Sequence, residues 1–65
     1  MKFNERLLEL RKSKKLSQEE LAEKLEVSRQ TISKWELAQS CPDFQSLIRI
    51  SNYYNISLDI LVKDS

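Results

Sequence analysis

The sequence predicts an all-α protein built from five short helices, and three observations support this. The chain has no glycine and one proline, Pro42, so little in it interrupts a helix. Apolar residues recur three and four positions apart, which is the spacing of one face of an α-helix. An apolar residue followed by serine occurs where a helix is expected to begin, at 16–17, 27–28 and 56–57.

Length and composition predict one small globular domain. The chain has 65 residues, of which 40% are hydrophobic and 32% charged, and these fractions are typical of a folded domain rather than a disordered tail. We expect a single domain over residues 1–65, with no room for a second, ligand-sensing domain. The net charge of +1 is low for a nucleic-acid-binding protein, but a near-neutral protein can still carry one positive face.

The single cysteine and the hydropathy pattern indicate the compartment. Cys41 is alone, which excludes an internal disulfide and a multi-cysteine metal site and suits a reducing environment. We interpret it as a loop spacer rather than a redox switch. The first residues lack a secretory apolar core, and no apolar run approaches membrane-spanning length. We therefore expect a cytoplasmic protein without membrane contact, metal or cofactor.

The first helix is predicted over residues 4–14. Phe3, Leu7 and Leu10 recur at roughly helical spacing, and Leu8 widens the apolar stripe. The second helix is predicted to begin after Ser17.

Three start signals agree at that second helix. Ser17 can cap the helix, Glu20 can hydrogen-bond back to it as a capping box, and Leu16 can pack against Leu21 as a hydrophobic staple. Val27 and Ser28 repeat the pattern before a third helix, in which Thr31 replaces the acidic partner of the box.

The second and third helices are predicted to cross steeply and share a core. Ala22 is the small residue expected where the two backbones meet, and Val27 fills the turn. The residues expected in the core are Leu21, Leu25, Ile32 and Trp35. The third helix is expected to end near Leu37.

The fourth and fifth helices follow a loop that contains Pro42. Asp43 is a candidate cap for the fourth helix, which is predicted to run to about Tyr54. Its predicted inner face consists of Phe44, Leu47, Ile50, Ser51 and Tyr54. The short fifth helix is predicted over residues 58–62, after Ile56 and Ser57 repeat the staple and cap.

Residues 18–36, QEELAEKLEVSRQTISKWE, resemble the DNA-binding helix-turn-helix of the Cro and lambda-repressor-like family, also called XRE-type regulators. The stretch VSRQTISKWE closely resembles the recognition helix of that family, and the resemblance extends over nearly the whole chain. There are two departures. Glu26 stands at a turn position where the family usually has glycine, and Ala38 replaces the glycine usually found just after the Trp-Glu pair.

The outward residues of the third helix are predicted to contact DNA. A guanidinium or ammonium can bind guanine O6 and N7, and a glutamine amide can bind adenine N6 and N7. The candidates for reading bases are Arg29, Gln30 and Lys34. The candidates for a secondary base or phosphate contact are Ser28, Thr31 and Ser33. The alternative is an ordinary solvated helix face. Such a face would be expected to carry more Glu and Lys and fewer Ser and Thr residues, which are poor helix formers.

Phosphate contacts are predicted at the start of the second helix, where free N–H groups and the positive end of the helix dipole favour an anion. The resemblance implies that Gln18 contacts the sugar-phosphate backbone of DNA. Lys14 and Lys15 in the preceding turn are further candidates, although basic runs usually face water. The resemblance also implies a structural ion pair between Arg11 and Glu36.

The resemblance implies a sequence-specific regulator of transcription that binds double-stranded DNA, and we expect a repressor. Two recognition helices about 34 Å apart are normally needed for specificity, so we expect a homodimer. The predicted interface consists of Ile56, Leu58, Ile60, Leu61 and Val62. The alternative is that these residues only close the helical bundle.

A second hypothesis is a protein-interaction module, such as an antitoxin-like protein that binds a regulatory partner. An enzyme is not expected, and we assign no catalytic residue. The sequence has no histidine, no glycine-rich phosphate loop and no nucleophile with an evident partner.

Overall fold

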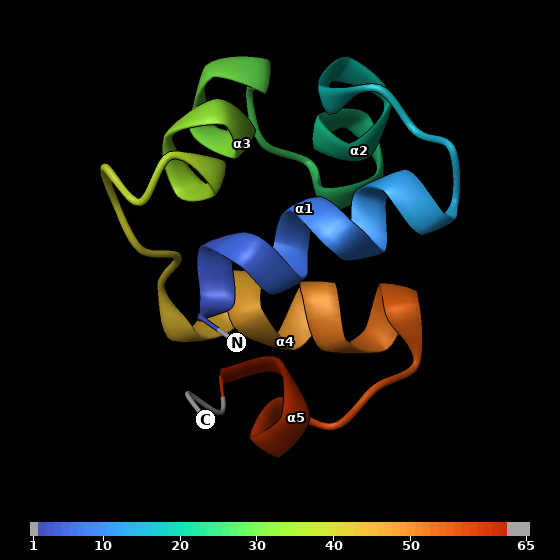
Figure 1. The fold of residues 1–65 in the computed structure, drawn as a ribbon, viewed down its shortest axis with the longest axis vertical. Helices are drawn as coiled ribbons and strands as arrows, with labels where there is room; N and C mark the ends of the chain where they lie inside the picture. The colour runs from blue at the N-terminus through green and yellow to red at the C-terminus, as the bar shows by residue number, and fades with distance from the viewer. Residues whose placement is uncertain (1, 63–65) are drawn as a thin grey trace.

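The computed structural model describes residues 2–62 and contains five helices, which confirms the predicted all-α class. They are α1 Phe3–Ser13, α2 Gln18–Leu25, α3 Arg29–Glu36, α4 Phe44–Tyr54 and α5 Leu58–Val62 (Figure 1). The prediction for α1 is displaced by one residue at each end. The other predicted boundaries agree with the structure to within one residue.

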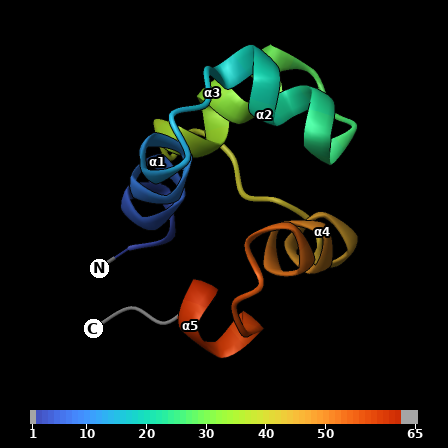
Figure 2. The same ribbon diagram turned by 90° about the vertical axis from the view of Figure 1, so that its right-hand side faces the viewer.

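The helices are arranged in three levels. In Figure 1, α2 and α3 lie together at one end, α1 and α4 cross the middle, and α5 lies at the opposite end. The view turned by 90° shows α1 and α4 on opposite sides of the molecule, with α2 and α3 above them (Figure 2). Contacts join α1 to α3 and α5, α2 to α3 and α4, and α4 to α5. The middle helices therefore support the α2–α3 pair on the rest of the protein.

The core of the described residues is dominated by the α2–α3 pair. The buried side chains are Leu7, Leu21, Ala22, Leu25, Ile32, Trp35, Ile50 and Leu61. All the residues predicted for the core of the helix crossing are in this set, and Val27 packs partly buried against them. Complete burial of one large apolar side chain contributes about 1.5–3 kcal/mol, so this pair is strongly held to the bundle.

Side-chain caps define the helix starts, as predicted. The Glu20 N–H donates to Ser17 Oγ at 3.0 Å, and the Ser17 N–H donates to Glu20 Oε1 at 2.8 Å. Hydrogen bonding from the Ser17 backbone N–H, and secondarily from its side chain, holds the pKa of the Glu20 carboxyl below its ordinary value. At α4, the Ser46 N–H donates to Asp43 Oδ1 at 3.0 Å, and the bonds from Ser46 lower the pKa of Asp43.

The first four helices end in the same way, with a residue in the left-handed region. Lys15, Glu26, Ala38 and Asn55 have φ angles of 57°, 60°, 59° and 56°. After α2, the Val27 N–H returns to the Ala22 carbonyl at 2.9 Å, which is the long hydrogen bond of a Schellman motif. Equivalent bonds follow α1, α3 and α4. Glu26, at the turn position where the family usually has glycine, is therefore left-handed although it carries a side chain.

One predicted core residue is wrong. Phe44 was expected on the inner face of α4, but its side chain is 69% exposed. It is the first residue of the helix, directly after the Asp43 cap. The apolar stripe of α4 thus begins one turn before the part of the helix that is packed, where Leu47 lies partly buried and Ile50 fully buried.

No helix within residues 2–62 combines the length and apolar character that crossing a membrane requires.

Candidate nucleic-acid interface

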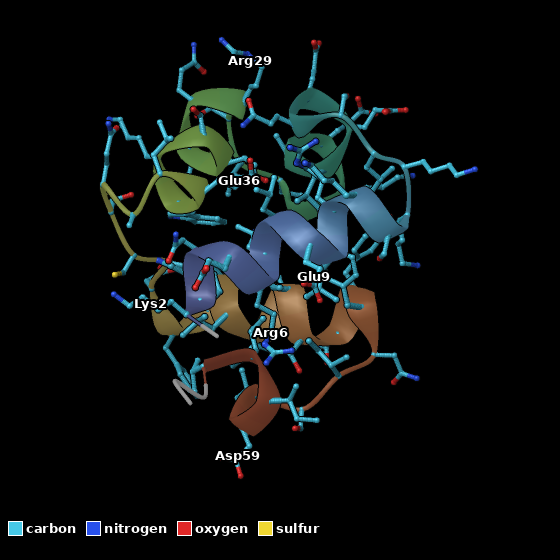
Figure 3. All side chains as sticks on the ribbon, in the orientation of Figure 1. Lys2, Arg6, Glu9, Arg29, Glu36 and Asp59 are labelled. Atoms are coloured by element: carbon cyan, nitrogen blue, oxygen red, sulfur yellow. The ribbon has the colours of Figure 1, made fainter. Side chains whose placement is uncertain are left out.

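Helix α3 presents a polar face to solvent and an apolar face to the core. Ile32 and Trp35 are buried, whereas the base-reading candidates Arg29, Gln30 and Lys34 are exposed. Arg29 projects at the outer end of the molecule, on the far side from Asp59 of α5 (Figure 3). The structure thus places all three candidates on one accessible helix without sacrificing core packing.

The hydroxyl groups at the start of α3 are bonded to each other. Ser28 Oγ accepts the Thr31 N–H at 3.2 Å and lies 2.8 Å from Thr31 Oγ1. Ser28 therefore caps the helix as predicted, and the Thr31 hydroxyl bonds to the Ser28 hydroxyl rather than to the Ser28 N–H that a capping-box carboxylate would accept. One of the two hydroxyl hydrogens remains free to donate to a base or phosphate, while Ser33 is half-buried.

The start of α2 offers unpaired backbone donors. Ser17 Oγ takes the N–H of Glu20, and the Ser17 carbonyl takes the N–H of Leu21. The N–H groups of Gln18 and Glu19, in the first two helical positions, have no carbonyl partner within the helix. The positive end of the helix dipole lies at the same place, so this terminus favours an anion.

The amide of Gln18 is attached to the end of α3. Its Nε2 donates to Glu36 Oε1 at 2.8 Å, across 18 residues of sequence. Sequence reasoning assigned Gln18 only to phosphate and missed this bond. Both residues were singled out from the sequence, but no local spacing rule relates residues 18 positions apart.

An ion pair joins α1 to the same carboxylate. Arg11 Nε donates to Glu36 Oε2 at 2.7 Å, and Arg11 Nη2 donates to Glu36 Oε1 at 3.3 Å. The side chains are 15% and 5% exposed, respectively. A third bond runs from Arg11 Nη1 to the carbonyl of Leu16 at 2.8 Å. Arg11 therefore holds both the end of α3 and the turn that precedes α2. In Figure 3, Glu36 lies between α3 and α2, above α1.

Tyr54 lies close enough to this ion pair to be influenced by it. Burial raises the pKa of its hydroxyl to about 12; the neighbouring Tyr53 and Glu36 act in the same direction, and Arg11 opposes them. The hydroxyl oxygen is buried and accepts or donates no hydrogen bond within the described residues.

The lysines of the α1–α2 turn differ from each other. The Lys14 ammonium lies 5.1 Å from the centre of the Tyr53 ring and 5.9 Å from that of Tyr54, within cation–π range. Lys14 is therefore directed toward α4, and a phosphate contact would require it to leave these rings. Lys15 is exposed in the left-handed turn. The sequence contains no signal for the contact of Lys14 with two residues about forty positions away.

The α5 residues divide into buried and exposed groups. Leu61 is completely buried, so its predicted place in a dimer interface is wrong, and it closes the bundle instead. Ile60 and Val62 are each 49% exposed, and Ile56 and Leu58 are partly buried against the core. The accessible apolar surface of α5 therefore centres on Ile60 and Val62.

Other polar features do not converge on a reactive centre. Cys41 is a free, exposed cysteine in the loop before α4. Within residues 2–62, no three His, Cys, Asp or Glu side chains are grouped as metal ligands would be. A shallow hollow on α1, lined by Glu5, Leu8, Glu9 and Lys12, is open to solvent.

Comparison with known proteins identifies the family. The family model described as helix-turn-helix matches residues 7–61, from α1 to α5. The chain belongs to the helix-turn-helix family. It carries a DNA-binding helix-turn-helix of the kind found in transcriptional regulators, and the resemblance to lambda-repressor-like proteins predicted from the sequence is confirmed.

Solved structures share the arrangement of this helix-turn-helix domain. The P22 c2 repressor, solved in complex with a synthetic operator, is similar with a TM-score of 0.92 and 31% identity, over 100% of this chain and 98% of that one. A transcriptional regulator from Listeria innocua has a TM-score of 0.91 and 33% identity, over 98% of this chain and 60% of that one.

A curated helix-turn-helix relative is the HTH-type transcriptional activator BcrR of Enterococcus faecalis. It is 48% identical over 62 residues, which cover 95% of this chain and 30% of BcrR. The chain spans between 30% and 56% of the lengths of the curated relatives it matches. These relatives are named as regulators of transcription rather than as enzymes.

Proposed function

We propose that this protein is a sequence-specific transcriptional regulator that reads the major groove of double-stranded DNA with α3. The observation that carries the proposal is the division of α3 into a buried face and an exposed face that bears Arg29, Gln30 and Lys34. Eight residues make a helix about 12 Å long, which matches a major groove about 12 Å wide.

Base reading follows from the chemistry of these three side chains. Arg29 and Lys34 can donate to guanine O6 and N7, and the Gln30 amide can both donate to and accept from adenine. Each bidentate pair discriminates between bases by roughly 1–3 kcal/mol. Ser28, Thr31 and Ser33 contribute secondary contacts to a base or phosphate.

Phosphate binding at the start of α2 sets the position of the domain on the duplex. The free N–H groups of Gln18 and Glu19 and the Gln18 amide meet one DNA backbone, and Lys15 adds screened attraction. The small net charge of +1 implies that these few local contacts, rather than a general positive field, dominate the electrostatic part of binding.

Specific operator binding requires two copies. One α3 reads only a few base pairs, and a second recognition helix about 34 Å away gives the usual specificity of such proteins. We assign the dimer contact to the exposed Ile60 and Val62, bordered by Ile56 and Leu58. The dimer represses transcription by occupying a promoter. It works in the cytoplasm, a reducing compartment that agrees with the single cysteine.

Selection of bound sequences from a randomised duplex library tests this function. Wild type and Gln30→Ala are selected in parallel at two salt concentrations, with Gln45→Ala on the exposed side of α4 as a matched control. We expect a pseudo-palindrome with half-sites about 10 bp apart, altered at defined positions by Gln30→Ala and unchanged by Gln45→Ala.

Absence of any enriched sequence, or binding that disappears as salt rises, would contradict the proposal, because it would leave only non-specific attraction to phosphate. A protein partner of the antitoxin-like kind would then be the function to test.

A further inference from the structure

The carboxylate of Glu36 joins three helices at the edge of the candidate interface. It belongs to the last residue of α3, and it accepts hydrogen bonds from Arg11 of α1 and Gln18 of α2. Its side chain is only 5% exposed, so DNA does not reach it directly. Any influence of Glu36 on DNA binding must pass through one of its two partners.

The bond to Gln18 determines which way the glutamine amide faces. An ionised carboxylate only accepts hydrogen bonds, so the NH₂ group of Gln18, and never its carbonyl oxygen, must point at Glu36. The NH₂ group has two hydrogens, and the 2.8 Å bond to Oε1 uses one of them. Gln18 is half-buried and is the first residue of α2, so it belongs to the same helix turn as the free N–H groups.

We propose that Glu36 is a positioning residue for DNA: it holds the Gln18 amide so that the second N–H faces a backbone phosphate. A phosphate oxygen is also only an acceptor, so it is bound by the N–H and repelled by the carbonyl of the same amide. The inference rests on the proposed function, and it adds a role that neither the family match nor the relatives' names assign.

Arg11 makes this arrangement compatible with an anion. A lone carboxylate near the phosphate would repel it, but the Arg11 guanidinium lies 2.7 Å from Glu36 Oε2 and balances the charge. Arg11 also binds the Leu16 carbonyl, immediately before the Ser17 cap of α2. The orientation of the Gln18 amide and the position of the α2 start are thus set by the same pair of charged residues.

Charge and orientation predict opposite effects of one substitution, which gives a sharp test. Glu36→Gln raises the net charge by one unit, so electrostatics alone would tighten DNA binding. Its amide can also donate, so Gln18 is free to turn its carbonyl toward the phosphate. We expect binding of the selected duplex to weaken by about threefold to tenfold.

Glu23→Gln is the matched control for charge. Glu23 is exposed on α2, and the same substitution there changes the charge equally without touching the network. We expect Glu23→Gln to bind as tightly as wild type or more tightly. Thermal unfolding of each variant sets the assay temperature, so that all are folded when affinity is measured.

A double-mutant cycle separates positioning from general structural damage. Gln18→Met removes the amide, so if Glu36 acts through Gln18, adding Glu36→Gln weakens binding no further. Two losses that add would overturn the inference, and so would a Glu36→Gln protein that binds as tightly as Glu23→Gln. If wild type itself selects no duplex, the proposed function fails and the inference fails with it. This outcome is distinguishable from failure of the inference alone, in which wild type still selects a duplex.

Nuclear magnetic resonance of the wild type provides a test that needs no destabilised variant. We expect the two side-chain amide protons of Gln18 to be well dispersed in the free protein, and the second proton to shift when the duplex is added. Gln45, exposed on α4, is the reference for a free amide. A Gln18 signal that matches that of Gln45 with and without DNA would overturn the inference.

Discussion

The α2–α3 end and the α5 end of the molecule are built differently. The α2–α3 pair supplies Leu21, Ala22, Leu25, Ile32 and Trp35 to the core, and it exposes mainly polar side chains. Helix α5 has five residues; it buries Leu61 and leaves Ile60 and Val62 half exposed. Within α2 and α3 the large apolar side chains are buried, whereas α5 leaves two of its apolar side chains half exposed.

This difference agrees with the proposed assignment of DNA to the α3 surface and of a second protein copy to the α5 surface. Polar side chains on a rigid, well-packed helix suit a hydrated and charged ligand such as DNA, because they need no reorganisation before binding. Exposed apolar side chains on the short helix α5 suit contact with another protein surface. Substitutions at the two ends should therefore change different properties.

The largest effect is expected from Arg11→Ala, which breaks the link between α1 and the α2–α3 end. Removal of one partner from a largely buried ion pair typically costs about 3–5 kcal/mol, because the other charge is left uncompensated. We expect the free energy of unfolding to fall by about that amount in urea titrations. Lys12→Ala, at an exposed neighbouring position, is the control.

A stable Arg11→Ala protein that had lost DNA binding would show instead that Arg11 contacts DNA. The distinction matters because both Glu36 and the turn before α2 depend on this one guanidinium.

The next effect separates the two sides of α5. Leu61→Ala removes a fully buried side chain and should lower the free energy of unfolding by about 2–5 kcal/mol. Ile60→Ala, at a half-exposed neighbour, should cost less than 1 kcal/mol in the monomer, on the order of a surface change, but should weaken self-association. Chemical denaturation and sedimentation equilibrium measure the two quantities.

Equal losses of stability from these two variants would mean that Ile60 is a core residue. Unchanged association in Ile60→Ala would place the dimer contact elsewhere.

A smaller and opposite effect is expected at the helix ends. Glu26 closes α2 in the left-handed region at φ 60°, where a side chain costs about 1–2 kcal/mol. Glu26→Gly should therefore raise the free energy of unfolding by up to about 1 kcal/mol, once the greater entropy of glycine in the unfolded chain is subtracted. The melting temperature should rise accordingly. Asn55→Gly at the end of α4 should gain less, because asparagine tolerates this region better.

A melting temperature that is unchanged or lower in Glu26→Gly would indicate that the α2–α3 turn has another geometry in solution.

The smallest expected effect is a loss of thermal stability at acid pH, and it tests the carboxylate caps of α2 and α4. Hydrogen bonds from Ser17 lower the pKa of Glu20, and those from Ser46 lower the pKa of Asp43. A depressed pKa in the folded state stabilises the protein above the ordinary pKa of a carboxyl, and that stability is lost as pH falls through the folded value. Melting temperatures should therefore decline modestly below about pH 4.

Glu20→Gln and Asp43→Asn should each flatten this acid limb and leave the alkaline side unchanged. A curve that keeps its full slope in both variants would assign the acid dependence to other carboxyl groups.

Local features of this fold are predictable from sequence, and contacts between distant side chains are not. The caps at Ser17 and Asp43 follow from bonds over three residues, and the α2–α3 core follows from periodic burial. The Arg11–Glu36 pair was anticipated only through resemblance to a family. The Gln18–Glu36 bond was not anticipated, because its geometry depends on how three helices pack.

Phe44 shows a second limit. Periodicity assigns a residue to a helix face, but burial also requires a neighbouring element that extends as far as that residue. Nothing in the spacing of Phe44, Leu47 and Ile50 reveals that packing begins only at the second of them.

The left-handed residues at the helix ends bear on how such a chain evolves without glycine. A side chain at each of these positions costs about 1–2 kcal/mol in the folded state, while a glycine there would cost about 0.5–1 kcal/mol through the added freedom of the unfolded chain. The second penalty offsets much of the first, so a single change to glycine gains at most about 1 kcal/mol. Residues such as Lys15 and Ala38 can therefore occupy these sites at a modest net cost in stability.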